Sequence, residues 1–208
     1  MPLTQPYSPH TPATMRTSRG QIDVPEYVAL AEFEKLDWDE RDHWELIEGV
    51  PCMAPAGVPE HQDILGVVFV YLVSKLQRRG YKVLVDVDVR FARQQSYLRP
   101  DISVFPPGCH PEPKATPVRE LPDLVVEFLS PSTASIDLGP KKAIYGRAGV
   151  KEYWVADPAT GALLIYTRAK GGDFEQLSAD EKGHVPSPLI GASLRIKREG
   201  GSFRVIEA

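Results

Sequence analysis

The stretch that decides the fold is "LPDLVVEFLSPST", residues 121–133. Its apolar run, residues 123–129, is short and leads into a segment of Ser, Pro and Thr, which is typical of a central β-strand that ends in a loop. Apart from Asp123 at its start, this run contains one carboxylate, Glu127, in its middle. A carboxylate removed from water needs a cation, a metal ion or a shifted pKa. We therefore expect a partner for Glu127 elsewhere in the chain.

A second acid lies in the preceding strand-like segment, "LRPDISVF" (98–105), where Asp101 follows Pro100. If the two segments pair, Asp101 and Glu127 meet at one end of a sheet. Two nearby carboxylates repel each other unless a proton or a cation lies between them. Mg²⁺ takes one or two protein carboxylates and keeps water on its other positions. The pair therefore predicts a site for Mg²⁺ or Mn²⁺.

The next segment predicts a helix over 135–150, with Asp137 as an N-cap candidate and Gly149 at its end. Asp137, Lys141 and Tyr145 follow one another at intervals of four and share a face. If this face meets the sheet, Lys141 reaches the carboxylates. A lysine beside a scissile phosphate can orient a water and offset the charge of the transition state. Tyr145 is interpreted as a core or dimer-interface aromatic.

The remaining pattern predicts an α/β (α+β) protein with a central mixed β-sheet flanked by helices. Residues 81–94 alternate as a strand with one solvated face does. Residues 59–80 carry an apolar stripe at helical spacing and are expected to form the main helix. The other expected elements are a helix at 25–36, a strand or hairpin at 43–55, a hairpin at 151–168, and late strands at "LRIK" and "FRVI".

Composition favours one ordinary globular domain. The chain has 208 residues, of which 42% are hydrophobic, so it can bury a single core. Residues 1–22 are rich in Pro, Ser and Thr and are predicted to be a flexible tail, which leaves 23–208 as a single domain. Cys52 and Cys109 match neither a disulfide framework nor a zinc pattern. Without a membrane span or a secretory signal core, we expect a cytoplasmic protein.

Several motifs resemble known nucleases. "PD" at 100–101, followed by the acid Glu127 in an apolar strand, resembles the PD-(D/E)XK nuclease superfamily. Leu129 stands where the usual signature has a lysine, so the signature is incomplete. Five motifs in order are nevertheless similar to the Uma-type family of restriction-endonuclease-like proteins: "WELIEG" (44–49), "PEHQ" (59–62), "RPDISV" (99–104), "VVEFLSPST" (125–133) and "DLGPKKAIYGRAGVKEYWVADP" (137–158).

The resemblance implies a restriction-endonuclease-like core and metal-dependent cleavage of DNA by a homodimer. It assigns Asp101 and Glu127 as ligands of Mg²⁺ or Mn²⁺. It assigns Lys141 as the catalytic lysine, moved from the strand to the following helix. Glu45 and His61 match family positions that either complete the metal shell or contact the phosphate backbone, and both join the catalytic candidates.

Each candidate also has a structural interpretation. Asp101 can hydrogen-bond a turn, and His61 can cap a helix. Glu127 can form a buried ion pair with Lys141 or Arg99 without any activity. The alternative function is therefore a catalytically inactive nuclease fold that serves as a binding or oligomerisation module. A nuclease directed at RNA also stays open, because no RNA-recognition motif is present and none is required.

The net charge of −4 argues against a protein that coats nucleic acid non-specifically, because such binding depends on Lys and Arg. Contact with DNA then requires a local basic patch. The candidates lie near the Asp101 strand and on or after the Lys141 helix: Arg90, Arg93, Arg99, Lys141, Lys142, Arg147 and Lys151.

Overall fold

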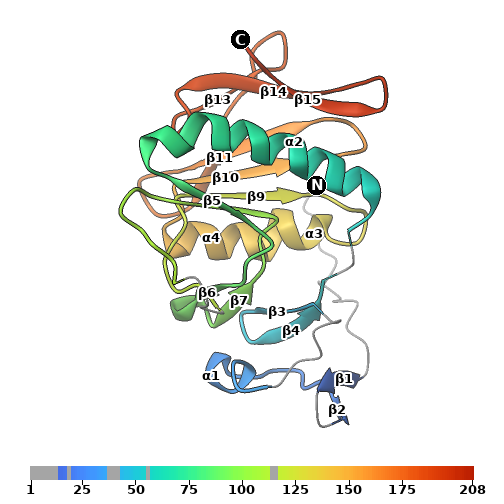
Figure 1. Ribbon diagram of the computed structural model, residues 1–208. Helices are drawn as coiled ribbons and strands as arrows, with labels where there is room; N and C mark the ends of the chain where they lie inside the picture. Colours follow the sequence, from blue (N-terminus) through green and yellow to red (C-terminus); the bar gives the residue numbers. More distant parts are fainter. Residues whose placement is uncertain (1–13, 18–19, 37–42, 55–56, 113–116) are drawn as a thin grey trace.

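A six-stranded mixed sheet forms the centre of the computed structural model, and a helix covers each of its faces (Figure 1). The strand order is β12-β11-β10-β9-β8-β5, in which β9 and β10 run parallel and the other neighbours antiparallel. This is the predicted α+β class with a central mixed sheet. The strands are β5 (Lys82–Val85), β8 (Ile102–Phe105), β9 (Leu124–Phe128), β10 (Glu152–Ala156), β11 (Leu163–Arg168) and β12 (Phe174–Gln176).

Strand β9 sends alternate side chains to the two faces of the sheet. Leu124 and Val126 belong to the core beneath α2 (Pro59–Leu76), the main helix expected at this place. Glu127 has the opposite parity and points to the face that α4 (Lys142–Ala148) covers. The apolar run therefore stays buried on both sides, and its one carboxylate is directed at the second helix.

A three-stranded sheet lies across α2 from the central sheet (Figure 1) and confirms the predicted late strands. A buried acid, Glu152 of β10, links it to the centre. Its carboxylate accepts hydrogen bonds from Trp154 Nε1 (2.9 Å), from Ser187 Oγ (2.8 Å) and from the backbone N–H of Leu189. The strands of the small sheet are β13 (Val185–Ser187), β14 (Ala192–Glu199) and β15 (Ser202–Glu207).

A four-stranded antiparallel sheet lies on the α4 side of the molecule in the order β4-β3-β7-β6 (Figure 1). Its β3–β4 hairpin confirms the hairpin predicted at 43–55. Glu45 lies on β3 and is buried. This second sheet therefore brings Glu45 toward the helix that faces Glu127. The strands are β3 (Trp44–Ile47), β4 (Val50–Met53), β6 (Val89–Phe91) and β7 (Ser96–Leu98).

Two segments predicted as single strands are each divided between the two sheets, so these predictions are wrong. Residues 81–94 form β5 in the central sheet and β6 in the four-stranded sheet, and residues 98–105 contain the end of β7 and all of β8. The chain turns at Asp86, which has a φ of +49°. It turns again at Pro100, which has no N–H for a strand ladder.

The helix predicted at 25–36 is much shorter in the structure. Only α1 (Leu30–Phe33) forms, and both of its terminal residues are buried. Its N-cap, Ala29, has no side-chain oxygen to satisfy the first N–H groups. The main helix is confirmed: α2 continues into a 3₁₀ turn (Gln77–Arg79) that ends at Gly80 with a φ of +83°.

Part of the predicted tail, residues 1–22, carries regular structure: β1 (Thr14–Thr17) pairs antiparallel with β2 (Gly20–Asp23). The rest of the tail lies outside the described residues, and the flexible tail and the single domain over 23–208 stay predictions. No helix in the described part of the chain is long and apolar enough to span a membrane. The structure describes residues 14–17, 20–36, 43–54, 57–112 and 117–208.

Candidate active site

The helix predicted over 135–150 is present, but its middle is a wide turn. A short helix, α3 (Ala134–Ile136), leads into a π turn (Asp137–Lys141), and α4 follows. Pro140 lies inside the π turn. A proline ring clashes with the carbonyl four residues earlier in an α-helix, and a wider turn relieves that clash. Asp137 and Lys141 are the first and last residues of this π turn, and both are buried.

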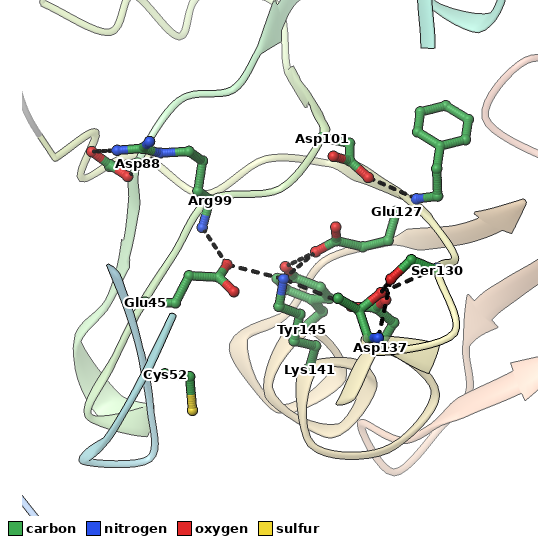
Figure 2. A network of polar contacts seen from close by, with 12 residues as sticks. Glu45, Cys52, Asp88, Arg99, Asp101, Glu127, Ser130, Asp137, Lys141 and Tyr145 are labelled. Atoms are coloured by element: carbon green, nitrogen blue, oxygen red, sulfur yellow. Dashed lines mark hydrogen bonds and ion pairs between the residues drawn. The ribbon is translucent and has the colours of Figure 1, made fainter. Parts of the chain in front are cut away.

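Lys141 lies at the centre of a buried cluster of acids (Figure 2). Its Nζ is 2.9 Å from Glu45 Oε1, 3.2 Å from Glu127 Oε1 and 3.7 Å from Asp137 Oδ1. The three acids come from β3, β9 and the π turn. The lysine thus reaches Glu127, as its place on the helix predicted.

Three acidic side chains surround one basic side chain in this cluster. Burial alone would lower the pKa of Lys141, but attraction by Glu127, Glu45 and Asp137 outweighs it and raises this pKa well above its ordinary value. The pKa of Glu127 is raised well above its ordinary value by burial and by repulsion from Asp137, Asp101 and Glu45, against the attraction of Lys141. Lys141 is therefore charged and does not fully neutralise its neighbours.

Asp101 lies beside Glu127 at the same end of the sheet. It directly precedes β8, which pairs with β9. Its Oδ2 accepts the backbone N–H of Phe128 at 2.7 Å, and its Oδ1 is 3.1 Å from Nε2 of His61. This bond to Asp101 raises the pKa of His61 against the effect of burial. The structure thus brings together the two predicted metal ligands and adds His61 to them.

The site is open on the Asp101 side. The side chains of Asp101 and His61 are 16% and 19% exposed, whereas those of Glu127 and Lys141 are only 5% and 7% exposed. A ligand from solvent therefore meets Asp101 and His61 first, with Glu127 and Lys141 behind them.

Glu45 joins the second sheet to the site. Its Oε1 binds Lys141 and also accepts the backbone N–H of Arg99 at 2.8 Å. The guanidinium of Arg99 forms two bonds to Asp88, with Nε–Oδ1 at 2.7 Å and Nη2–Oδ2 at 3.0 Å. Of the two cations considered for Glu127, Lys141 is the one that binds it.

The basic residues considered for DNA contact are largely paired with acids. The local positive excess is therefore smaller than the sequence suggests, and the DNA partner and the homodimer both stay predictions. Lys142 is directed elsewhere, with its Nζ 4.6 Å from the ring centroid of Tyr166. The ion pairs are Arg90 with Glu34, Arg99 with Asp88, Arg147 with Glu48, and Lys151 with Asp123.

Tyr145 contacts the site, although its sequence pattern was interpreted as core or interface. Its hydroxyl donates a hydrogen bond of 2.7 Å to Glu127 Oε1, one helical turn after Lys141. The ring is fully buried, so the core interpretation holds for the ring but misses the hydroxyl. The sequence signal for this contact is the spacing of four residues, which places Tyr145 on the same helix face as Lys141.

The residues at the site fit a hard divalent cation. Asp101 and Glu127 supply two carboxylates, the number that Mg²⁺ commonly takes from a protein. Both hydrogen bonds to the Glu127 side chain fall on Oε1, which leaves Oε2 without one from the described residues. The excess of buried acidic side chains over basic ones also favours a cation. Within the described ranges, no three His, Cys, Asp or Glu side chains converge as a complete metal cage, so waters would fill the remaining positions.

Comparison with known proteins gives the family. The family described as "Uma2: Putative restriction endonuclease" matches residues 30–197. The chain belongs to the Uma2 family. The match includes all five catalytic candidates predicted from the sequence, and it confirms the resemblance drawn from the five sequence motifs.

Two other proteins are similar to this chain. A Synechocystis protein described as "Uncharacterized protein slr1290" is 26% identical over 172 residues, which cover 80% of this chain and 89% of that protein. The crystal structure of "a putative nuclease belonging to DUF820" from Anabaena variabilis has a TM-score of 0.65 and 22% identity, and the likeness covers 79% of this chain and 91% of that one. At this identity the crystal structure supports the Uma2 fold.

The Asp137→Asn variant is expected to flatten the pH dependence of stability. Burial raises the pKa of Asp137 from 3.8 to about 6, although Lys141 and Thr133 oppose this shift. A raised carboxylate pKa stabilises the folded state below the unfolded pKa, and this contribution is lost as the pH rises from about 4 to about 6. Urea unfolding in EDTA should therefore show a smaller loss between pH 4 and pH 7 in Asp137→Asn than in the parent. Asp173→Asn, on an exposed loop, controls for the loss of one charge.

Proposed function

We propose that this Uma2 protein is a metal-dependent endonuclease that hydrolyses phosphodiester bonds in DNA. The observation that carries the proposal is the meeting of Asp101, Glu127 and Lys141 where β8 begins and β9 ends, partly exposed on the Asp101 side. Membership of Uma2, whose description is "Putative restriction endonuclease", supports the same reaction class.

In this proposal Asp101 and Glu127 hold Mg²⁺ or Mn²⁺. Such a cation, when bound, polarises a phosphoryl oxygen and lowers the pKa of a bound water. Lys141 stays protonated because of its acidic neighbours, so it donates hydrogen bonds and does not act as a base. Its ammonium orients the attacking water and offsets the negative charge that develops on the phosphoryl oxygens.

Glu45 and His61 act as positioning groups in the same proposal. Glu45 binds Lys141 and the backbone N–H of Arg99 through one oxygen, which fixes the distance between the lysine and the chain that leads to Asp101. His61 contacts Asp101 Oδ1, so it directs that carboxylate from the first turn of α2. Its partly exposed position also places it where a phosphate backbone would approach.

A catalytically inactive binding or oligomerisation module is the second candidate function. The ion pairs of Lys141 with Glu45 and Glu127 favour it, because a buried ion pair can exist without catalysis. The pairing of most nearby basic residues with acids favours it as well. The two candidates differ in whether the carboxylates bind a divalent cation.

Nicking of supercoiled plasmid by the full-length protein tests the proposal. We expect nicking with Mg²⁺ or Mn²⁺ and none with EDTA. Asp101→Asn should lower the rate by at least about a hundredfold, because one of the two ionised ligands is lost. Asp173→Asn removes an exposed acid that is not part of the site and should leave the rate unchanged.

The result that contradicts the proposal is the absence of cleavage with either cation while the protein remains folded. Parallel reactions with a single-stranded RNA of matched length identify the substrate. Cleavage of RNA alone would transfer the proposal from DNA to RNA, whereas cleavage of neither would favour the inactive module.

A further inference from the structure

We propose that Tyr145 is a positioning residue that fixes the carboxylate of Glu127, so that one oxygen is held by the helix and the other faces the cation site. This inference rests on the proposed function, because it names how one metal ligand is directed. It gives a role to the hydroxyl of Tyr145, a residue whose buried ring is explained by core packing.

The hydrogen bonds on Glu127 are unequal between its two oxygens. Oε1 accepts the hydroxyl of Tyr145 at 2.7 Å and the ammonium of Lys141 at 3.2 Å. Among the described residues, Oε2 receives no hydrogen bond. In Figure 2 this second oxygen lies on the side of the carboxylate toward Asp101. The helix therefore holds one oxygen and presents the other.

The ring of Tyr145 cannot easily move away from this bond. It is fully buried, and its centroid lies 5.4 Å from that of Phe91 and 5.1 Å from that of Tyr153. The hydroxyl of Tyr153 donates a bond of 3.0 Å to the backbone carbonyl of Asp137 in the π turn. Aromatic packing thus fixes both the tyrosine hydroxyl and the turn that carries Lys141.

Lys141 alone is a weaker constraint on Glu127. Its ammonium lies closer to Glu45, at 2.9 Å, than to Glu127, at 3.2 Å. Without the Tyr145 hydroxyl, the Glu127 carboxylate keeps the hydrogen bond from Lys141, a donor that it shares with Glu45. The carboxylate can then rotate more freely. Groups that orient a metal ligand typically contribute about tenfold to a hundredfold in metal affinity. We therefore expect Tyr145→Phe to weaken Mn²⁺ binding by about tenfold or more.

The chain contains a matched control for this substitution. On α2, the hydroxyl of Tyr71 donates to Glu207 Oε1 at 2.6 Å, and Lys75 binds the same oxygen at 2.6 Å. The arrangement repeats the tyrosine, lysine and glutamate of the site, but it lies between α2 and β15 and is more exposed. Tyr71→Phe removes the same atom from the same kind of contact, remote from the cation site.

The experiment is a Mn²⁺ titration of the full-length parent, Tyr145→Phe and Tyr71→Phe, with free Mn²⁺ read by electron paramagnetic resonance. Thermal unfolding is measured on the same samples. We expect Tyr145→Phe alone to bind Mn²⁺ at least about tenfold more weakly, with both variants folded. Equal affinity of Tyr145→Phe and the parent overturns the inference and leaves the proposed nuclease intact. A parent that binds no Mn²⁺ overturns the proposed metal site, and the inference with it.

A double-mutant cycle provides a second measurement that does not depend on metal. If the hydroxyl acts through the Glu127 carboxylate, Tyr145→Phe lowers the free energy of unfolding less in the Glu127→Ala background, which lacks the acceptor, than in the parent. An equal loss in both backgrounds would show that the hydroxyl is independent of Glu127, and the inference would be wrong. The cycle also remains informative if Tyr145→Phe folds poorly on its own.

Discussion

Replacing Lys141 with methionine is expected to lower the rate of plasmid nicking by about a hundredfold to a thousandfold at saturating Mn²⁺. Methionine keeps most of the length and the apolar stem of the side chain, so the main change is the loss of the ammonium. That group is the only cation within 4 Å of Glu127 among the described residues. The initial rate of conversion of supercoiled to nicked plasmid measures the effect.

The neighbouring lysine provides the control. Lys142 points to the ring of Tyr166 and away from the carboxylates, so Lys142→Met should retain nicking within a few-fold. Lys141→Met also leaves three buried carboxylates without their counter-ion and should lower the free energy of unfolding by about 3 to 5 kcal/mol. Circular dichroism under assay conditions therefore has to show that the variant is folded. A folded Lys141→Met protein that nicks at the parent rate would exclude Lys141 from catalysis.

The meeting of two acids where β8 begins and β9 ends could be predicted, because each sequence signal for it lies within a short stretch of the chain. An acid inside an apolar strand needs a partner, and a second acid in the preceding segment meets it if consecutive strands pair. The spacing of four from Asp137 to Lys141 gave the shared helix face. These steps depend on neighbouring strands, strand alternation and helical periodicity, which the sequence displays directly.

The contribution of the second sheet was not predictable in the same way. Residues 81–94 alternate throughout, yet the chain changes sheets at Asp86. Alternation indicates only that each half of this segment has one buried side, and a strand in either sheet has such a side. The contacts of Glu45 with Lys141 and Arg99 depend on this change of sheet. Likewise, Glu152 is satisfied by groups about 35 residues later in the chain, at Ser187 and Leu189.

The hydroxyl of Tyr145 shows a further limit. An aromatic residue on a buried helix face is explained by packing alone, and nothing in its type distinguishes a hydroxyl that meets a carboxylate from one that meets a backbone carbonyl. Tyr145 and Tyr153 are both fully buried, and their hydroxyls have these two different partners. Only the three-dimensional arrangement assigns one of them to the site.

Glu127→Gln is expected to stabilise the metal-free protein and to abolish Mn²⁺ binding and nicking. The pKa of Glu127 is raised well above its ordinary value, by burial first and by repulsion from other acids. A raised carboxylate pKa means that the stabilising contribution is present at low pH and is lost as the pH rises toward the folded pKa. At neutral pH in EDTA, the neutral amide removes this cost and should raise the free energy of unfolding. The amide oxygen still accepts from Lys141 and Tyr145.

The sign of this change separates the nuclease from the inactive scaffold. A glutamate retained for a structural ion pair should lose stability when it becomes glutamine, whereas a glutamate retained for a cation should lose function and gain stability. Glu152→Gln is the internal comparison, because its carboxylate accepts from three groups and the amide would turn an N–H toward one of them. It should destabilise the protein and leave Mn²⁺ affinity unchanged. Urea unfolding in EDTA and Mn²⁺ titration of both variants measure these effects, and a destabilised Glu127→Gln with parental Mn²⁺ binding would favour the scaffold.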